Sequence, residues 1–343
     1  MHRRHVLQQL LKGLAAGSLL GPALLPAQNQ PTGQAGVART GGAQPGQKTL
    51  SSVIRSQAEY KIDPAAWKAL QQWEHYTKGV ERLNGAFDRY VYDGTFLVEK
   101  RASGEFWYES PDKGRIDFRP TSEKLLPEPN ASGQRLNPRK QGPQGQPYTV
   151  QADNASRWVC RGDALLYIDD EQKTYEVMRI PPHMQGQNIT RSPLPFLFGM
   201  SAEEMDRRYY ITLGQRTEYA GRKVVNLIAA PRTEALAKEW SRAEVFLDPG
   251  TYFQDSNRQP VFVPVAMRLF DSTGNTETVY FFRLDQTKLN AGWLGGFRNP
   301  FTEPNGILQG YTCTGTHDVA MEPKEENRTV ENPQQVTPGG LFR

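Results

Sequence analysis

Residues 83–119 read LNGAFDRYVYDGTFLVEKRASGEFWYESPDKGRIDFR, and this stretch decides the fold. Apolar and polar side chains alternate along it, which is the pattern of strands with one buried face. Turn signals at Asp93-Gly94, at Ser103-Gly104 and at residues 110–114 divide it. We expect four strands in an antiparallel meander, marked in turn by these apolar residues: Leu83, Phe87 and Val91; Phe96 and Val98; Phe106 and Tyr108; Ile116 and Phe118.

Further strand patterns follow, joined by Gly-, Asp- and Pro-containing turns and without the alternating rhythm of βαβ units. They cover residues 157–160, 164–168, 174–180, 209–213, 223–229, 242–247, 261–270 and 278–284. We therefore predict a mainly β (α+β) fold, an incomplete and strongly curved antiparallel barrel of about 11–12 strands.

Helices are expected over the concave face of this sheet. Asp63 is a good N-cap with Pro64 at the first helical position, and apolar residues recur at helical spacing to about Val80. Ser201 and Glu204 form a capping box that predicts a second, short helix. The apolar segment at residues 192–199, SPLPFLFG, reads as a plug that precedes it.

The rest of the chain divides by composition. Residues 1–27 read as an export signal, with a basic start, an apolar run rich in Gly and Ala, and Ala27 as cleavage position. Residues 28–60 and 313–343 are too polar to bury a core, so we expect a disordered tether and tail around one domain at 61–312. A polar tract at 122–147, rich in Pro and Gly, predicts a surface loop inserted between strands.

Charge gives no reason to expect nucleic acid as a partner. Three of the 41 Lys and Arg residues lie in the first twelve positions, which leaves 38 basic against 37 acidic residues in the rest of the chain. No Cys lies near the expected cleavage position, which argues against a lipid anchor. We expect a monomer, exported to the periplasm or cell envelope and soluble there, by either the general or the twin-arginine route.

Catalytic and metal-site patterns are not evident. The histidines outside the export signal, His75, His183 and His317, are not spaced as metal ligands, and neither G-x-S-x-G nor a P-loop occurs. The acidic residues at 203, 204 and 206 fall in the first turns of a capped helix, where negative charge is favourable anyway. We expect no enzyme activity, no metal and no cofactor.

Two cysteines, Cys160 and Cys313, leave two alternatives open. In an oxidising compartment an even number of cysteines suggests a disulfide, and closing so long a loop would add about 4–5 kcal/mol in the chain-entropy model. The other alternative is two thiols that do not meet.

Four motifs, in order along the chain, resemble those of LolA-like lipoprotein carriers. They are GEFWYESPDKGRIDFRP at 104–120, GDALLYID at 162–169, PFLF at 195–198, and FRNPF at 297–301 followed by PNG at 304–306. The resemblance covers roughly residues 65–310 and is closest to exported LolA-type domains of planctomycete bacteria. It implies a curved half-barrel whose concave apolar face, in the carriers, takes lipoprotein acyl chains.

We therefore expect an exported, non-enzymatic carrier or sensor that holds the acyl chain of a lipid or lipoprotein in the concavity. The alternative is an envelope interaction module with a packed interior, which binds another protein or a polysaccharide through its loops. An open cavity favours the first function and a filled interior the second. The predicted lining residues are Trp67, Leu70, Trp73, Phe87, Val91, Phe96, Val98, Phe106, Tyr108, Ile116, Phe118, Leu194, Phe196, Phe198, Tyr280 and Phe282.

Overall fold

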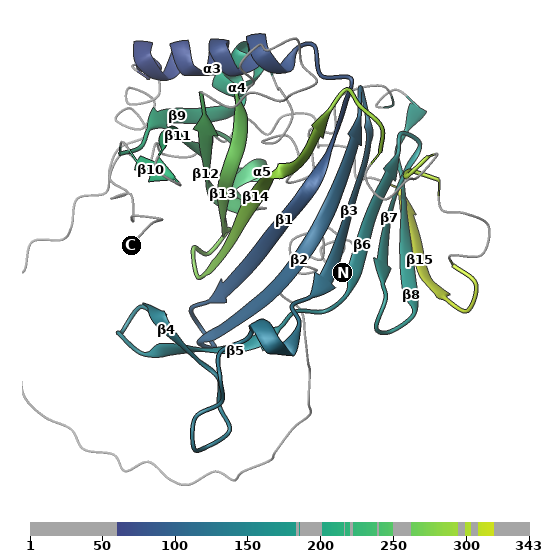
Figure 1. Cartoon of the computed structure of the whole chain (residues 1–343). Helices are drawn as coiled ribbons and strands as arrows, with labels where there is room; N and C mark the ends of the chain where they lie inside the picture. The colour runs from purple at the N-terminus through teal and green to yellow at the C-terminus, as the bar shows by residue number, and fades with distance from the viewer. Residues whose placement is uncertain are drawn as a thin grey trace, which may run out of the picture.

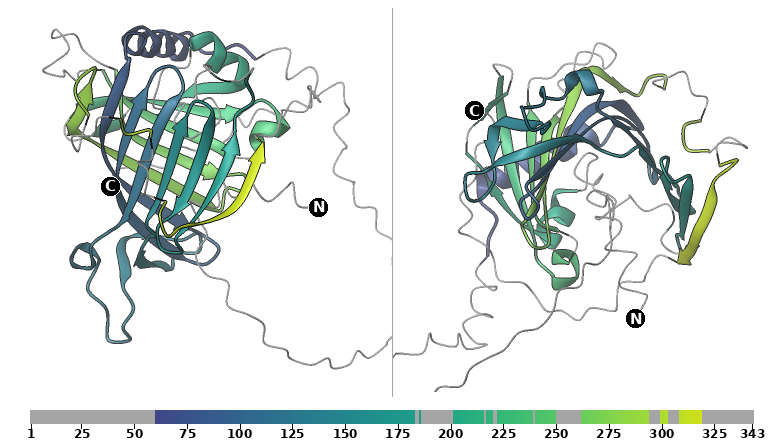
Figure 2. Two further views of the ribbon diagram at one scale, coloured as in Figure 1. Left: turned by 90° about the vertical axis from the view of Figure 1, so that its right-hand side faces the viewer. Right: turned by 90° about the horizontal axis from the view of Figure 1, so that it is seen from below.

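The structure, a computed structural model, describes residues 60–182, 185, 201–215, 217–219, 222–238, 240–249, 262–293, 299–302 and 308–318. Within them, 15 strands form one sheet, in the order β10-β11-β12-β13-β14-β1-β2-β3-β6-β7-β8-β15, with β9 on β11 and the β4–β5 pair on β2. The sheet is open and bent into an arch, whose two walls are β12–β14 and β6–β8 (Figure 2). The predicted fold class, a mainly β, strongly curved and incomplete antiparallel barrel, is confirmed.

The strand bounds are β1 Arg82–Asp93, β2 Val98–Glu109, β3 Lys113–Pro120, β4 Leu136–Gln141, β5 Pro147–Ala152, β6 Ser156–Arg161, β7 Ala164–Asp169, β8 Thr174–Arg179, β9 Tyr209–Leu213, β10 Thr217–Tyr219, β11 Arg222–Pro231, β12 Trp240–Asp248, β13 Val263–Asp271, β14 Thr276–Leu289 and β15 Thr312–Asp318. Neighbours run antiparallel, except that β15 pairs with β8 and β5 with β2 in parallel.

The meander of residues 83–119 has three strands, because the turn expected at Ser103-Gly104 is wrong. β2 runs through that dipeptide without a break, and Gly104 lies opposite Phe87 of β1. A Cβ atom on Gly104 would stand only 2.2 Å from Cζ of Phe87. The glycine is therefore needed for the close approach of an aromatic ring, not for a turn. The other two turns are present, and the Asp93 carboxylate accepts hydrogen bonds from the backbone of Thr95 and Phe96.

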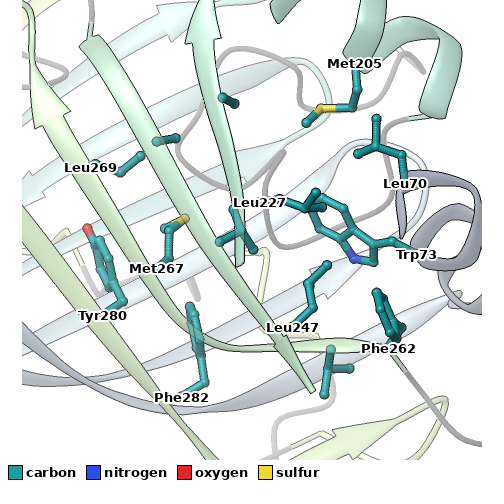
Figure 3. Close-up of a cluster of buried hydrophobic side chains, with 14 of the residues drawn as sticks. Leu70, Trp73, Met205, Leu227, Leu247, Phe262, Met267, Leu269, Tyr280 and Phe282 are labelled. Carbon is teal, nitrogen blue, oxygen red and sulfur yellow. The ribbon is translucent and has the colours of Figure 1, made fainter. Parts of the chain in front are cut away.

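Helices α3 (Pro64–Thr77), α4 (Ala202–Arg208) and α5 (Glu234–Ala237) cover the concave side. As predicted, the Asp63 side chain caps α3 by accepting from Ala65 N, and Ser201 caps α4 by accepting from Glu204 N. Helix α3 ends three residues before the expected Val80. Side chains from α3 and α4 meet those of β11–β14 in one buried core (Figure 3). The sheet and these helices thus form two layers around that core.

The insertion at residues 122–147 is not merely a loop. It contains a short 3-10 helix, η2 (Glu123–Leu125), and strand β4, which with β5 forms an arm at the end of the sheet opposite α3 (Figure 1). Strand β15 lies in the segment expected as a disordered tail, and it forms one edge of the sheet beside β8. These additions, with the short β10, account for the excess over the expected number of strands.

Candidate functional site on the concave face

Strand register assigns each side chain to one face of the sheet. Phe87 lies opposite Gly104 on β2 and Phe282 on β14, so these positions share the concave face with alternate residues of their strands. The same register carries across β3 and β6, where Ile116 lies opposite Trp158. The concave face can therefore be followed continuously from β11 to β8.

Most of the predicted lining residues come together on this face. One buried cluster holds Leu70, Trp73, Phe87, Phe106, Tyr108, Ile116, Phe118, Tyr280 and Phe282, with Trp67 half-buried against it. Among the side chains that the sheet contributes to this cluster, Phe87 is central. The centre of its ring lies 5.6 Å from that of Phe118 and 5.5 Å from that of Tyr280. In the part of the concavity bounded by α3, β1–β3 and β14, these side chains are buried against one another.

Three other groups of the predicted residues have different outcomes. Val91 is buried on the concave face, whereas Val98 is only half-buried. The assignment of Phe96 to the lining is wrong, because this side chain lies in the β1–β2 turn and is 76% exposed. The residues of the predicted plug, Leu194, Phe196 and Phe198, lie outside the described residues.

The wall made by β6 and β7 differs from the filled part. Trp158, Leu165 and Tyr167 occupy its concave face and are only half-buried. The Trp158 and Tyr167 rings meet edge to face at 5.0 Å, and Trp158 packs against the main core. Burial raises the pKa of the Tyr167 phenol to about 12. We call Trp158, Leu165 and Tyr167 the concave strip. It is an apolar surface next to the main core, and its side chains remain partly exposed.

Alternation alone does not reveal the concave strip. In β6 and β7 the aliphatic residues Val159, Leu166 and Ile168 are the more deeply buried set, and they form a separate cluster with Leu308 and Tyr311 on the convex face. Both faces of this wall are therefore apolar. The signal that could have identified the strip is the pairing with β3, which places Trp158 beside the inward-facing Ile116.

A buried charged pair also lies on the concave side of the sheet. Arg89 shares the concave face of β1 with Phe87 and Val91 and is 1% exposed. Its Nη2 donates to Oδ2 of Asp153 at 2.5 Å, and its Cζ lies 3.9 Å from the centre of the Phe118 ring. Arg89 Nε has no hydrogen-bond partner among the described residues. The sequence pattern does not reveal this pair, because Arg89 occupies an inward position where the alternation predicts an apolar side chain.

Two tyrosines lie in the field of this pair. Tyr280, opposite Arg89 in the register of β1 and β14, has its pKa raised by burial, although a hydrogen bond with Arg89 acts in the other direction. The charges of Arg89 and Asp153 also act on the Tyr167 phenol. The charges of the pair thus act on Tyr280 in the core and on Tyr167 in the concave strip.

The convex face carries a second chain of charges. Glu244 bridges Arg268 at 3.0 Å, Arg268 bridges Glu277 at 2.7 Å, and Glu277 bridges Lys140 of the arm at 2.5 Å. Asn137, also in the arm, donates to Glu99 of β2. Burial raises the pKa of Glu277, but Lys140 and Arg268 more than compensate and hold it below its usual value. These charges anchor the arm, since they join β4 to β14 directly and through β14 to β13 and β12, and the Asn137–Glu99 hydrogen bond joins β4 to β2.

The fold shows whether Cys160 and Cys313 can form a disulfide. Cys160 is buried in β6 and Cys313 is exposed in β15, and both are free thiols. Strands β7 and β8 separate them, so they lie about 14 Å apart at 4.8 Å per strand. A disulfide between them, one of the two alternatives, is excluded because this separation exceeds bonding distance.

Two features are absent from the described residues. In this part of the chain, no three residues of the types His, Cys, Asp and Glu gather as they would to hold a metal ion. Of the helices described, none has the length and apolar character needed to span a membrane.

Comparisons with known proteins give similarity only at the level of structure. No protein family matches the sequence. No curated protein matches it either. Similar solved structures include an outer membrane lipoprotein-sorting protein domain from Vibrio parahaemolyticus, with 10% identity, 67% of this chain and 94% of that chain covered, and a TM-score of 0.31.

LprF from Mycobacterium bovis has 12% identity, with 68% of this chain and 97% of that chain covered, and a TM-score of 0.34. A LolA superfamily protein from Nitrosomonas europaea has 7% identity, with 66% and 94% covered, and a TM-score of 0.30. These identities and TM-scores describe a similarity of the backbone only, and no ligand or partner of this protein is inferred from them.

Proposed function

We propose that this protein is an exported, non-enzymatic carrier or sensor of the cell envelope that holds the acyl chain of a lipid or lipoprotein against the concave strip. Export is supported by the sequence pattern of residues 1–27, which lie outside the described residues. Kinship with exported LolA-type domains of planctomycete bacteria is part of the proposal and rests on the four sequence motifs. We further propose that the protein acts as a monomer and without a cofactor.

The observation that carries the proposal is the difference between the two parts of the concave face. Near α3 the apolar side chains are buried by one another, whereas Trp158, Leu165 and Tyr167 remain half-exposed. Aromatic rings on the inner side of a curved sheet are a suitable surface for an acyl chain, because the chain gains roughly 0.8 kcal/mol for each methylene group that it buries. A chain of ten buried methylenes would thus gain about 8 kcal/mol before the entropic costs of binding.

Uptake of a fluorescent acyl probe tests the proposal. We expect Tyr167→Ser to weaken binding of the probe, because it removes a ring from the concave strip. Tyr90→Ser is the matched control, since Tyr90 is also half-buried but lies on the convex face, under Arg101. Lipid extraction and mass spectrometry of gently purified protein is the second readout. Protein that contains no lipid and takes up no probe would contradict the proposal.

A second candidate function, an envelope interaction module, is favoured by a separate observation. Phe96 and Leu125 are 76% and 72% exposed, in the β1–β2 turn and in η2. Exposed apolar side chains mark a surface that binds a protein where they form one contiguous patch. If this function is the principal one, Phe96→Ser combined with Leu125→Ser abolishes capture of an envelope protein, whereas Tyr167→Ser leaves it unchanged.

A further inference from the structure

Residues 308–318, which we call the strap, lie on the convex side of the wall formed by β6–β8. Leu308 and Tyr311 pack against the apolar cluster of Val159, Leu166 and Ile168, and β15 then runs parallel to β8 at the edge of the sheet (Figure 1). Six of the seven residues of β15 are exposed. The side chains that attach the strap to the wall are therefore mainly the two that precede its strand.

The Tyr311 ring lies in a site built from three charged side chains of β6 and the β7–β8 turn. Its hydroxyl donates to Oδ1 of Asp170 at 2.7 Å, and Nζ of Lys173 donates to the same hydroxyl at 3.1 Å. Nζ of Lys173 and Cζ of Arg157 lie 4.9 Å and 5.9 Å from the centre of the ring, within the range of cation–π attraction. Arg157 also holds Asp170 in place, since its Nη2 donates to Oδ1 at 2.7 Å. We call Arg157, Asp170 and Lys173 the tyrosine clamp, because together they contact both the ring and the hydroxyl of a phenol.

The strap also supplies hydrogen bonds to the edge of β8. Thr312 N donates to the carbonyl oxygen of Lys173 at 2.9 Å, and Thr314 Oγ1 donates to that of Tyr175 at 3.2 Å. Without the strap, β8 would be the edge of the sheet, with its Tyr175 and Val177 in the apolar cluster. Because an edge strand with an apolar face pairs readily with an extended chain, this place needs a segment that covers it.

The strap is attached in a way that allows exchange. Backbone hydrogen bonds along an exposed strand add little net stability, because ordering the strand costs conformational entropy that they must offset. The attachment therefore depends on Leu308 and on the contact of Tyr311 with the clamp. We infer that the tyrosine clamp and the edge of β8 form a docking site for another protein, which binds through an extended segment with a tyrosine directly before its strand. In the free protein the strap occupies this site, and its own residues show which chemistry the site accepts.

A peptide probe tests the docking site in the full-length protein. The probe has the sequence of residues 308–318, with Cys313→Ser to prevent oxidation and a fluorescent label at its C-terminal end. In wild-type protein the strap competes for the site from within the same chain, so the probe should bind weakly. The double variant Leu308→Ser with Tyr311→Ser removes the anchors of the strap, and we expect it to bind the probe at least tenfold more tightly than wild type does.

Further substitutions link binding to the tyrosine clamp. Added to the double variant, Asp170→Ala removes the acceptor of the phenol and should weaken binding of the probe about tenfold. Asp163→Ala is the matched control, because Asp163 pairs with Arg161 at the neighbouring turn and should leave binding unchanged. A probe with Tyr311→Ser should bind at least tenfold more weakly than the original probe.

Hydrogen exchange of the wild-type protein is a readout that needs no variant. Excess probe should speed the exchange of amides in residues 312–318, because the strap leaves, while exchange in residues 174–179 stays slow, because the probe then covers β8. Unchanged exchange in residues 312–318, or equal binding of the probe to wild type and double variant, would overturn the inference. Dimerisation of the wild type that the double variant lacks would identify a second copy as the occupant and contradict another protein as the partner. These outcomes do not depend on acyl binding, because the strap packs on the convex face.

Discussion

Replacing Gly104 with alanine tests the packing of the concave core at its tightest point. The new Cβ would stand 2.2 Å from Cζ of Phe87 and 2.6 Å from the backbone oxygen of Asp117. The ring cannot move away freely, because Phe118, Tyr280 and Phe282 surround it. The carbonyl cannot move without disturbing the pairing of β2 with β3.

The magnitude follows from two opposing effects. Overpacking of a core costs typically 1–3 kcal/mol, and the backbone contact at Gly104 places it toward the upper end, roughly 3 kcal/mol. Glycine in a strand is less favourable than alanine by about 0.5–1 kcal/mol, which offsets part of the cost. We expect the free energy of unfolding to fall by about 2 kcal/mol and the melting temperature by about 4–8 °C.

Urea unfolding followed by tryptophan fluorescence measures this change. Gly79→Ala is the control, because a Cβ there meets no atom within 4 Å, and its effect should stay within about 0.5 kcal/mol. Adding Phe87→Leu to Gly104→Ala should recover about 1 kcal/mol of coupling in a double-mutant cycle. Equal stability of the two alanine variants would refute the close packing of Phe87 on β2.

Three further predictions concern charge and exposure. Asp153→Ala leaves Arg89 buried without its counter-ion and should cost about 3–5 kcal/mol of unfolding free energy in urea titration, and a loss below 1 kcal/mol would contradict burial of the pair. Because the pKa of Glu277 in the fold lies below its ordinary 4.5, its contribution to stability is complete above about pH 4.5 and is lost as pH falls through the folded pKa. Glu277→Gln, which cannot titrate beside Lys140, should reduce the slope of unfolding free energy against pH in that acid range, and an unchanged slope would refute the assignment. Phe96→Ser should change the melting temperature by less than about 2 °C, since the side chain is 76% exposed, and a larger fall would show that it packs.

The fold could be predicted from the sequence because its determinants are local. Alternation in β1 and β3, the Asp93-Gly94 turn and the caps at Asp63 and Ser201 each specify short-range structure, and their combination allows only a curved antiparallel sheet with helices on one side. The turn predicted at Ser103-Gly104 is wrong for a physical reason. In a sequence, a glycine that allows a neighbouring side chain to approach the backbone cannot be told from a glycine that allows a turn. Only the position of Phe87 on the neighbouring strand shows which role Gly104 has.

The site was less predictable because it depends on pairing between distant strands. Aromatic residues occur on both faces of β1 and β14, since Tyr90 and Phe281 lie on the convex face, whereas Phe87 and Phe282 belong to the main buried core. In β7 both faces are apolar, and neither Leu165 nor Tyr167 can be assigned until the neighbour of β6 is known. Arg89 was overlooked since a charged residue at an inward position contradicts the pattern that identifies the strand. Such contradictions are where functional residues are expected.

Photo-crosslinking tests the central claim most directly. A glycerol ester whose acyl chain carries a diazirine near its end would be bound to the full-length protein, irradiated, and the labelled residues mapped by peptide mass spectrometry. We expect labelling within residues 156–169, at the concave strip of Trp158, Leu165 and Tyr167, and loss of this labelling with excess unlabelled ester. Labelling confined to convex positions such as Tyr90 or Val177, or labelling that excess ester does not reduce, would contradict it.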